Sequence, residues 1–479
     1  MRTIVKLSLA ALTLALAAVA FVASASAGGG NGNGHDITRA ALRPGVIQHI
    51  VVIDLENEDF GDTFGPSSPA RYLNDTLLQR GELVTNYFAT SHASLGNYIS
   101  QVSGQASTPT ANNDCISLST LPNLVGGYYD VTPGTDADAA QWPGQVLGDG
   151  CVYPAPVDGS HKSKGSHGAQ TIGDQLQAAR HADAGPHISW RQYAEDMGNS
   201  PLRDGGTPDP LGGTDCAHPP LGGTDPTNTA TAADQYATRH VGFLYFHSVI
   251  DDQASCDEHV VPLGSVTLGV NGHRDTFSGH LAQDLSREET TPEFSFITPN
   301  LCNDGHDATC AGLNTEGGHT GGLVGADLWL KHWMPLILDS PAYRSGTMLV
   351  VVTFDEGNPV KTAAGSAACC GERPGPNWSN PGFSPILGLF GYQTPPAPGT
   401  FPYPGGGQVG AVLLNRRYIK AGSVNSTGFY NHYSALRSYE DLLGLTRGGD
   451  DGYGHLGFAA DPGLVPFGHD VFNAAHGDD

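Results

Sequence analysis

Two strongly apolar runs, each followed at once by acidic or amide side chains, most constrain how this chain folds. The runs span residues 49–55 and 348–354, and the polar pairs that follow them are Glu56-Asn57 and Asp355-Glu356. Runs this continuously apolar are typical of central strands in a parallel sheet, which are buried on both faces. Ligands of such sheets gather at the carboxyl ends of the strands. The two pairs therefore predict one hard-cation site assembled by folding; the alternative is that each pair merely caps or turns the chain.

Other segments extend the same pattern along the chain. Apolar strand candidates lie near residues 49–54, 83–88, 241–247, 294–298, 347–354 and 385–390. Helical patterns between several of them cover residues 70–79, 96–102, 171–182, 322–338 and 433–443. Strands that alternate with helices predict an α/β fold, namely a three-layer α/β/α sandwich with a largely parallel central sheet.

Two segments interrupt this alternation. Residues 104–168 and 200–235 lack periodicity and are rich in Gly, Pro, Asp and Thr. The second contains a short duplication, Pro210-Leu-Gly-Gly-Thr-Asp215 and Pro220-Leu-Gly-Gly-Thr-Asp225, which is too short to form a repeat architecture. Length alone allows two or three domains. We interpret residues 47–479 as a single domain with two surface insertions.

The first 27 residues have the features of a secretory signal. Arg2 and Lys6 precede an apolar stretch over residues 7–22, and Ala25-Ser26-Ala27 forms a cleavage site before a flexible segment at 28–46. A retained anchor is the alternative, but the small-residue exit disfavours it. No other stretch is long and apolar enough to span a bilayer. The sequence predicts a secreted protein without a stable membrane anchor.

An exported protein with eight cysteines is expected to form disulfides. Proximity in the chain favours the pairs Cys115–Cys151, Cys216–Cys256 and Cys302–Cys310. Cys369 and Cys370 remain as a vicinal bridge or as partners for other cysteines. A structural zinc site is the rival, and no C-x2-C pair supports it.

The chain is strongly acidic. Its formal net charge is −25, and removal of the signal with its two basic residues leaves about −27. Such a surface disfavours nucleic acid and anionic membranes as partners. An anionic substrate must therefore be held by local features such as a metal or a helix N-terminus.

The segment from Ser91 to Ile99 follows the strand candidate at 83–88 and leads into a helical pattern. Ser94 would lie at the helix N-terminus, where free N–H groups and the helix dipole favour an anionic phosphate. A metal that lowers its hydroxyl pKa would make it a nucleophile. The alternative is a simple N-cap, the commonest role of Ser at this position.

Further candidate site residues follow other elements. Asp304, His306 and Asp307 lie on one loop after the strand candidate at 294–298, where they supply oxygen and nitrogen ligands or form a polar turn. His432 opens the helical pattern near the C-terminus, and His240 precedes the strand candidate at 241–247 as a weaker substrate-binding candidate. Glu316 and His319 rank below the loop at 304–307.

Five motifs in one order resemble a known family. They are Glu56-Asn57 with Phe60, the segment 91–98, the segment 299–307, Phe354-Asp355-Glu356-Gly357, and Asn431-His432-Tyr433-Ser434. Together they resemble the bacterial phosphoesterase family of secreted acid phosphatases and phospholipases C, a branch of the alkaline-phosphatase-like superfamily. The match covers about residues 47–470.

The resemblance implies an alkaline-phosphatase-like α/β/α fold. It implies that the metal ligands are Glu56, Asn57, Asp355 and Glu356. Ser94 resembles the nucleophile of nucleotide pyrophosphatases, Asn97 falls where that group contacts phosphate, and His92 is a nearby acid/base candidate. Two departures leave metal identity and ligand geometry open: Glu356 stands where some relatives have Asp, and Arg-Ser is missing after Glu56-Asn57.

We therefore expect a metal-dependent hydrolase of phosphate monoesters. Ser94 would attack phosphorus to form a phosphoseryl intermediate, with His306 or His432 protonating the leaving oxygen and Asp304 as a further metal ligand. The divalent cation could be Zn, Ca, Mg or Mn. The alternatives are a phospholipase C-type phosphodiesterase acting on phospholipids and a secreted binding protein without catalysis. No C-x-P-x-R sulfatase motif or G-x-S-x-G esterase motif is present.

Overall fold

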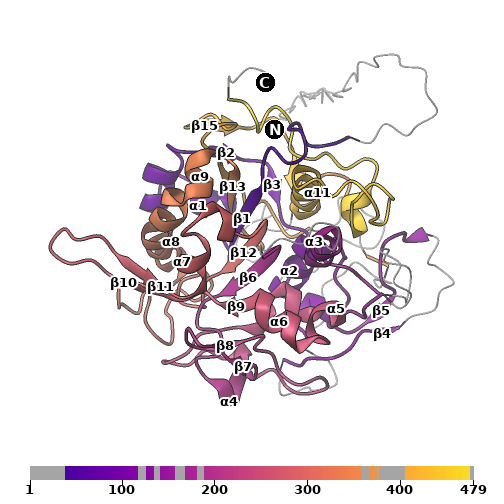
Figure 1. Ribbon diagram of the computed structural model, residues 1–479, viewed down its shortest axis with the longest axis horizontal. Coiled ribbons are helices and arrows are strands. Elements are labelled where there is room, and N and C mark those ends of the chain that lie inside the picture. The colour runs from indigo at the N-terminus through magenta and orange to yellow at the C-terminus, as the bar shows by residue number, and fades with distance from the viewer. Residues whose placement is uncertain are drawn as a thin grey trace, which may run out of the picture. The chain divides into compact units, whose positions relative to one another are not determined.

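A mostly parallel sheet forms the centre of the molecule in the computed structural model (Figure 1), which describes residues 38–116, 126–133, 141–156, 168–180, 188–358, 367–372, 375–376 and 405–474. Its eight strands are ordered β15-β2-β14-β13-β1-β12-β6-β9. Their bounds are β1 His49–Leu55, β2 Glu82–Val84, β6 Trp190–Ala194, β9 Val260–Pro262, β12 Phe294–Thr298, β13 Met348–Phe354, β14 Ala411–Leu414 and β15 Ser423–Asn425. Only β14 is antiparallel to its neighbours. The expected α/β fold with a largely parallel sheet is confirmed.

The two apolar runs form the central pair of strands. All seven residues of β1 and all seven of β13 are buried. The strands are parallel, and their register pairs His49 with Met348 and Leu55 with Phe354. Because the two strands pair residue for residue over their full length, they end at the same level of the sheet. Glu56 and Asp355, the next residues, therefore lie side by side.

Helices lie on both sides of the sheet (Figure 1). One side carries α1 (Phe60–Phe64), α8 (Gly322–Asp339) and α9 (Pro341–Ser345), and the other carries α2 (Ser94–Ser103), α3 (Ile172–Arg180) and α11 (His432–Leu442). The buried face of α8 includes Trp329, Trp333 and Ile337. This arrangement has the three layers expected from the sequence.

Short elements make up most of the remaining structure. The strands are β3 Tyr87–Phe88, β4 Thr132–Pro133, β5 Gly148–Asp149, β7 Thr207–Pro208, β8 Thr214–Asp215, β10 Ser265–Thr267, β11 Thr276–Ser278 and β16 Tyr430–Asn431. The helices are α4 Pro201–Asp204, α5 His247–Ile250, α6 Gln253–His259 and α7 His280–Asp284. Single turns of other helix types lie at Leu73–Leu77, Ala111–Asn113, Pro226–Asn228, Thr238–His240, Gly242–Tyr245, Glu288–Thr290 and Gly457–Ala460.

One predicted strand is wrong, and four short strands of the central sheet were missed. Residues 242–245 form a 3-10 turn, in which Gly242 packs so closely on α2 that a Cβ would lie 2.6 Å from the Tyr98 carbonyl oxygen. An apolar run alone does not distinguish such a buried turn from a strand. The missed strands β6, β9, β14 and β15 have three to five residues each, too few for a periodic signal. The candidate at 385–390 lies outside the described residues.

All eight cysteines form disulfides. The three predicted pairs are present, and the remaining two residues form the vicinal bridge Cys369–Cys370. The bridge Cys115–Cys151 closes the first predicted insertion, and Cys216–Cys256 ties the second to α6. The predicted signal and most of the segment 28–46 fall outside the described residues, which begin at Thr38. Within those residues, no helix has both the length and the apolarity needed to cross a bilayer.

Candidate active site

The candidate active site lies where β1, β12 and β13 end. Glu56 and Asp355 follow paired strand ends, and the Asp355 N–H donates to the Leu55 carbonyl at 2.7 Å. The loop after β12 joins them because the Glu56 N–H donates to the Asp304 carbonyl at 2.8 Å. Gly305 permits this approach, since a Cβ there would lie 2.7 Å from the Glu56 carbonyl oxygen. Three buried carboxylates from distant parts of the chain thus share one edge of the sheet.

Ser94 points at Glu56. It is the first residue of α2, is 3% exposed, and its Oγ donates to Glu56 Oε2 at 2.8 Å. The N-cap of α2 is Ala93, so the Ser94 hydroxyl does not have the capping role that was the alternative interpretation. The Leu95 N–H in the first turn donates instead to Asp114 Oδ1 at 3.0 Å. The Ser94 hydroxyl is therefore directed into the acidic centre.

Glu56 is the hub of this centre. Besides Ser94, its carboxylate accepts hydrogen bonds from the Tyr98 hydroxyl at 2.6 Å and from Asn57 Nδ2 at 2.8 Å. Asn57 has a φ of 55°, a left-handed conformation that Asn tolerates better than most residues. This conformation also lets its N–H donate to Asp355 Oδ1 at 3.0 Å. Burial raises the pKa of Glu56 well above its ordinary value, and the charges of Asp355 and Asp304 raise it further.

Asp355 and Asp304 each leave one carboxylate oxygen unsatisfied. Asp355 Oδ1 accepts the N–H groups of Asn57 and Glu356, and Asp304 Oδ1 accepts the His306 N–H. Oδ2 of each residue is buried without a hydrogen-bond partner among the described residues. Burial raises the pKa of Asp304 to about 7 and that of Asp355 to about 6. Desolvated oxygens of this kind are costly unless a proton or a cation satisfies them.

His240 lies between two of these carboxylates. Its Nε2 is 3.3 Å from Glu56 Oε1, and its Nδ1 is 3.5 Å from Asp304 Oδ2. The ring stacks on Tyr98 with centroids 5.3 Å apart. Burial, followed by the nearby Arg239, holds the pKa of His240 well below its ordinary value. His240 thus lies in the acidic centre, although its chain position gave only a weak signal.

His306 occupies the more open side of the centre. Its side chain is 38% exposed, its Nδ1 lies 2.7 Å from Asp307 Oδ1, and its ring centroid is 6.5 Å from that of His240. Burial lowers the pKa of His306, but the hydrogen bond to Asp307 and the charges of Asp304 and Asp307 outweigh it and raise the pKa overall. An accessible imidazole with a raised pKa can donate a proton at this position.

Glu356 and His92 form a separate pair. The His92 Nδ1 contacts Glu356 Oε2 at a short distance, and both side chains are almost fully buried. Burial raises the pKa of Glu356 well above its ordinary value, with Asp355 and Asp114 adding to the effect. Glu356, expected as a metal ligand, instead holds the His92 ring in this structure.

His432 does not offer a ring nitrogen to a substrate. Its Nε2 donates to the Asp355 carbonyl at 2.8 Å, so its Nδ1 accepts from the Tyr87 hydroxyl at 3.2 Å. Burial lowers the pKa of His432 to about 4, despite the backbone hydrogen bond. A neutral ring with both nitrogens engaged cannot serve as the proton donor expected from the sequence. His432 instead contacts the backbone of Asp355.

Asn97 does not face the centre either. Its Oδ1 accepts the N–H groups of Thr90 and Ser91 at 3.0 and 2.9 Å, and its Nδ2 donates to the Ser91 carbonyl at 3.0 Å. The side chain is fully buried. The amide expected to contact phosphate therefore shapes the turn that leads into Ser94.

Replacing Asn97 with Ala should destabilise the protein by about 2–4 kcal/mol, because three backbone groups, two of them buried, lose their partner. Urea unfolding measures the change, with Asn74→Ala as a control on a half-buried side chain that also bonds backbone carbonyls. An unfolding free energy of the Asn97→Ala variant within about 0.5 kcal/mol of the wild type would contradict this role.

Three charged residues near the centre, Arg239, Glu195 and Asp196, were not predicted from the sequence. Arg239 is buried, donates to Asn228 Oδ1 at 3.1 Å, and has its Nε 3.7 Å from Asp114 Oδ2. Its charge lowers the pKa of Glu56, although burial dominates there. The pair Glu195-Asp196 at the end of β6 is a further acidic strand end, and Glu195 Oε2 holds the loop after β12 through the Asn300 N–H at 3.0 Å. The rule that identified Glu56 and Asp355 applies to it too, but the polar strand β6 was not recognised.

The chemistry of the donor set suits a divalent cation. Glu56, Asp304 and Asp355 are buried carboxylates, two of them with unsatisfied oxygens, and Asn57 adds an amide. Hard cations prefer such oxygen donors. Their metal-binding atoms are more widely spaced than those of a second group, Asp209, Asp215 and His280. Among the described residues, this second group is the one set of three His, Cys, Asp or Glu residues whose ligand atoms all lie within 4.8 Å of one another.

Comparisons with known proteins identify a family for this chain. The profile of the Phosphoesterase family matches residues 72–446. The chain is 26% identical over 308 residues to a phosphate-repressible acid phosphatase of Penicillium chrysogenum, covering 64% of this chain and 48% of that protein. It is 22% identical over 305 residues to a probable acid phosphatase of Kluyveromyces lactis, covering 64% and 46%. The chain thus spans about half the length of these curated relatives.

Solved structures give weaker similarities. A Vibrio parahaemolyticus protein in the alkaline phosphatase superfamily aligns with a TM-score of 0.38 and 10% identity, covering 85% of this chain and 69% of that one. Murine ectonucleotide pyrophosphatase/phosphodiesterase 5 aligns with a TM-score of 0.34 and 12% identity, covering 87% and 100%. TM-scores this low assign no activity.

Proposed function

Because the chain belongs to the Phosphoesterase family, we propose that it hydrolyses phosphate monoesters with Ser94 as the nucleophile and a divalent cation as the cofactor. The observation that carries the proposal is the 2.8 Å hydrogen bond from Ser94 Oγ to Glu56 at the N-terminus of α2. The acid phosphatase relatives support a phosphate ester as the substrate. The four disulfides support export to an oxidising compartment.

Ser94, Glu56 and His306 have different roles in the reaction. Ser94 Oγ forms a bond to phosphorus as the bond to the leaving oxygen breaks, and Glu56 Oε2, 2.8 Å from Oγ, takes the hydroxyl proton. His306 gives a proton to the leaving oxygen. Water then attacks phosphorus and gives a proton to His306, the bond from phosphorus to Ser94 Oγ breaks, and Glu56 returns its proton to Ser94 as phosphate is released.

Other side chains hold these groups in place. Glu56, Asn57, Asp304 and Asp355 would hold the cation, which supplies positive charge to offset the phosphoryl oxygens. His92 is oriented by Glu356 as a second acid/base group, and His240 keeps Glu56 and Asp304 apart. A preorganised centre of this kind lowers the barrier without moving at the moment of reaction.

The test of the proposal is hydrolysis of 4-nitrophenyl phosphate by the purified protein, compared with phosphatidylcholine and phosphatidylinositol in vesicles. We expect turnover of the monoester, and lack of activity toward every phosphate ester would favour a binding protein. An apolar cavity of about 570 Å³ supports the phospholipase C alternative. Its walls include Phe429, Phe458 and Tyr433, and Tyr433 adjoins His432. Release of phosphocholine without monoester turnover would establish that alternative.

Replacing His306 with Ala should affect poor leaving groups most. We expect kcat for an alkyl phosphate such as glycerol phosphate to fall by about 100-fold or more. For 4-nitrophenyl phosphate the loss should be below about 10-fold, because 4-nitrophenolate leaves without a proton. Equal losses on the two substrates would remove the proton-donor assignment. His319→Ala is the matched control, since its Nδ1 bonds the Gly312 carbonyl outside the centre.

A further inference from the structure

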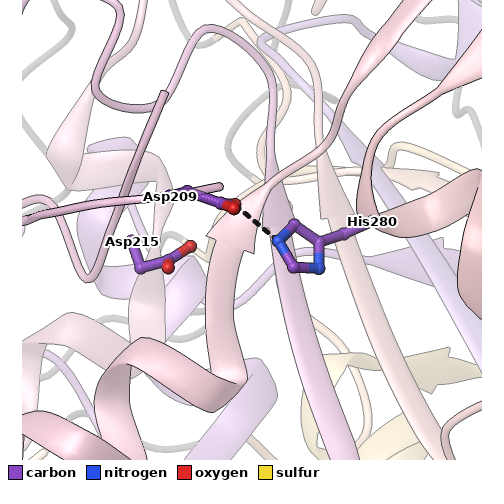
Figure 2. Close-up of side chains that lie close together, drawn as sticks. All are labelled: Asp209, Asp215 and His280. Carbon is purple, nitrogen blue, oxygen red and sulfur yellow. Dashed lines mark hydrogen bonds and ion pairs between the residues drawn. The ribbon is translucent and has the colours of Figure 1, made fainter. Parts of the chain in front are cut away.

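A second cluster of metal-binding side chains lies outside the active site. Asp209, Asp215 and His280 bring three potential ligand atoms within 4.8 Å of one another, and Figure 2 shows their side chains converging. Asp209 follows β7, Asp215 ends β8, and His280 begins α7. None of the three contributes to the centre around Ser94.

The proton on His280 can be placed from its neighbours. Arg191 Nη1 lies 3.2 Å from Nδ1, and because a guanidinium only donates, Nδ1 accepts. The proton is therefore on Nε2, which donates to Asp209 Oδ2 at 2.5 Å (Figure 2). The other oxygen of Asp209 accepts the Leu211 N–H at 2.6 Å. His280 thus orients Asp209 and has no lone pair available for a metal.

Asp215 has no comparable partner. The residue is 8% exposed, and its Oδ1 is buried without a hydrogen bond among the described residues. Figure 2 shows its carboxylate turned toward Asp209 and His280. The nearby cation Arg191 donates to Asp284 Oδ2 at 2.6 Å and to the Glu258 carbonyl at 3.0 Å. Two carboxylates therefore face each other with excess negative charge between them.

The duplicated hexapeptide provides an internal comparison. Asp209 precedes the first copy and Asp215 ends it, whereas the second copy has Pro219 before it and Asp225 at its end. Asp225 Oδ1 accepts the Thr227 N–H at 2.9 Å and the Thr227 hydroxyl at 2.7 Å. In the second copy, the single Asp therefore has its hydrogen bonds supplied by the protein itself. Only the copy flanked by two acidic residues leaves a carboxylate oxygen unsatisfied.

We propose that Asp209 and Asp215 bind a divalent cation of the calcium class, with His280 orienting Asp209. Carboxylate oxygens are the preferred donors of Ca²⁺, whereas zinc would require the lone pair that His280 Nε2 lacks. The cation would hold the two ends of the β7–β8 hairpin together, and the hydrogen bond from His280 to Asp209 would connect this hairpin to α7. The Cys216–Cys256 disulfide already fastens the residue after β8 to α6. The site therefore stabilises the second insertion and is independent of catalysis.

The test compares thermal unfolding in chelator and in millimolar calcium chloride. Every protein carries Asp355→Asn, so that the active centre contributes little to the response. For the parent protein, which carries Asp355→Asn alone, the Tm should be roughly 3 °C higher in calcium than in chelator. Asp215→Asn and Asp209→Asn should each abolish the rise, and calorimetric titration should show one fewer calcium site per chain. Asp225→Asn is the matched control, and its Tm should rise in calcium by as much as that of the parent.

The chelated proteins provide a second readout. Asp215→Asn removes one of two facing charges, so we expect its Tm in chelator to equal or exceed that of the parent. The same calcium response in Asp215→Asn and the parent would overturn the proposal. A response to zinc chloride but not to calcium would overturn the assignment to hard cations. Stabilisation of the parent by mild acid with no calcium response would show that the carboxylates share a proton instead.

Discussion

Replacing Ser94 with alanine is expected to lower kcat/KM for 4-nitrophenyl phosphate by about 10⁴-fold or more, because no other described hydroxyl donates to Glu56 from the first turn of α2. The side chain is small, and Glu56 Oε2 keeps the hydrogen bond from Asn57 Nδ2 when the Ser94 hydroxyl is removed. We therefore expect the unfolding free energy to stay within about 1 kcal/mol of the wild-type value. Steady-state kinetics and urea unfolding measure the two quantities.

Ser103→Ala is the matched control for this experiment. Ser103 ends the same helix, is fully buried, and its Oγ donates to the Ile99 carbonyl at 2.7 Å. Its replacement should leave kcat within about 3-fold of the wild type. Near-normal turnover by the Ser94→Ala protein would show that Ser94 is not the nucleophile. Rapid-quench trapping of labelled phosphate should find a phosphoseryl enzyme in the wild type alone.

Removing bound metal with a chelator should reduce kcat by about 10³-fold or more, and one of Zn, Ca, Mg or Mn should restore it. The reason is electrostatic: Glu56, Asp304 and Asp355 are buried close together, and without a cation they would repel a phosphate dianion. Elemental analysis of the purified protein, followed by assays of the chelated protein with each chloride salt, makes the measurement.

Two variants separate this cation from the one proposed at the β7–β8 hairpin. Asp355→Asn should lower activity without further loss in chelator, because the active centre no longer retains its metal. Asp215→Asn should keep wild-type activity and wild-type sensitivity of activity to the chelator. Full activity of the chelated wild-type protein would disprove metal dependence, while calcium-dependent stability could still persist.

Much of the centre can be predicted from local sequence. The runs 49–55 and 348–354 are apolar at most of their buried positions, so they predict central strands, and the residues after them predict the site. Their even register in the sheet brings Glu56 and Asp355 together as expected. The loop at 304–306 joins them because β12 pairs with β1. Short strands such as β9 carry too few residues to be recognised.

The partner of each polar side chain was harder to predict. Glu356 was expected to bind metal, yet it contacts His92, and Asn97 was expected to contact phosphate, yet it bonds the turn before Ser94. His432 was expected to donate a proton, yet both its ring nitrogens are engaged. A motif specifies which donors and acceptors are near a site, but their pairing depends on angles and distances set by remote elements.

The apolar runs and the polar residues that follow them are properties of the sequence alone, because burial imposes its pattern on consecutive residues. They determined the central strands of the sheet and the edge at which Glu56 and Asp355 meet, and the segment 91–99 determined the position of Ser94 at the start of a helix. The tertiary structure alone decided which carboxylates are satisfied and which are not. Asp215 and Asp225 end identical hexapeptides, yet only Asp215 has an unsatisfied buried oxygen facing a second carboxylate. Hydrogen bonding depends on neighbours brought together by folding, and identical sequences acquire different neighbours.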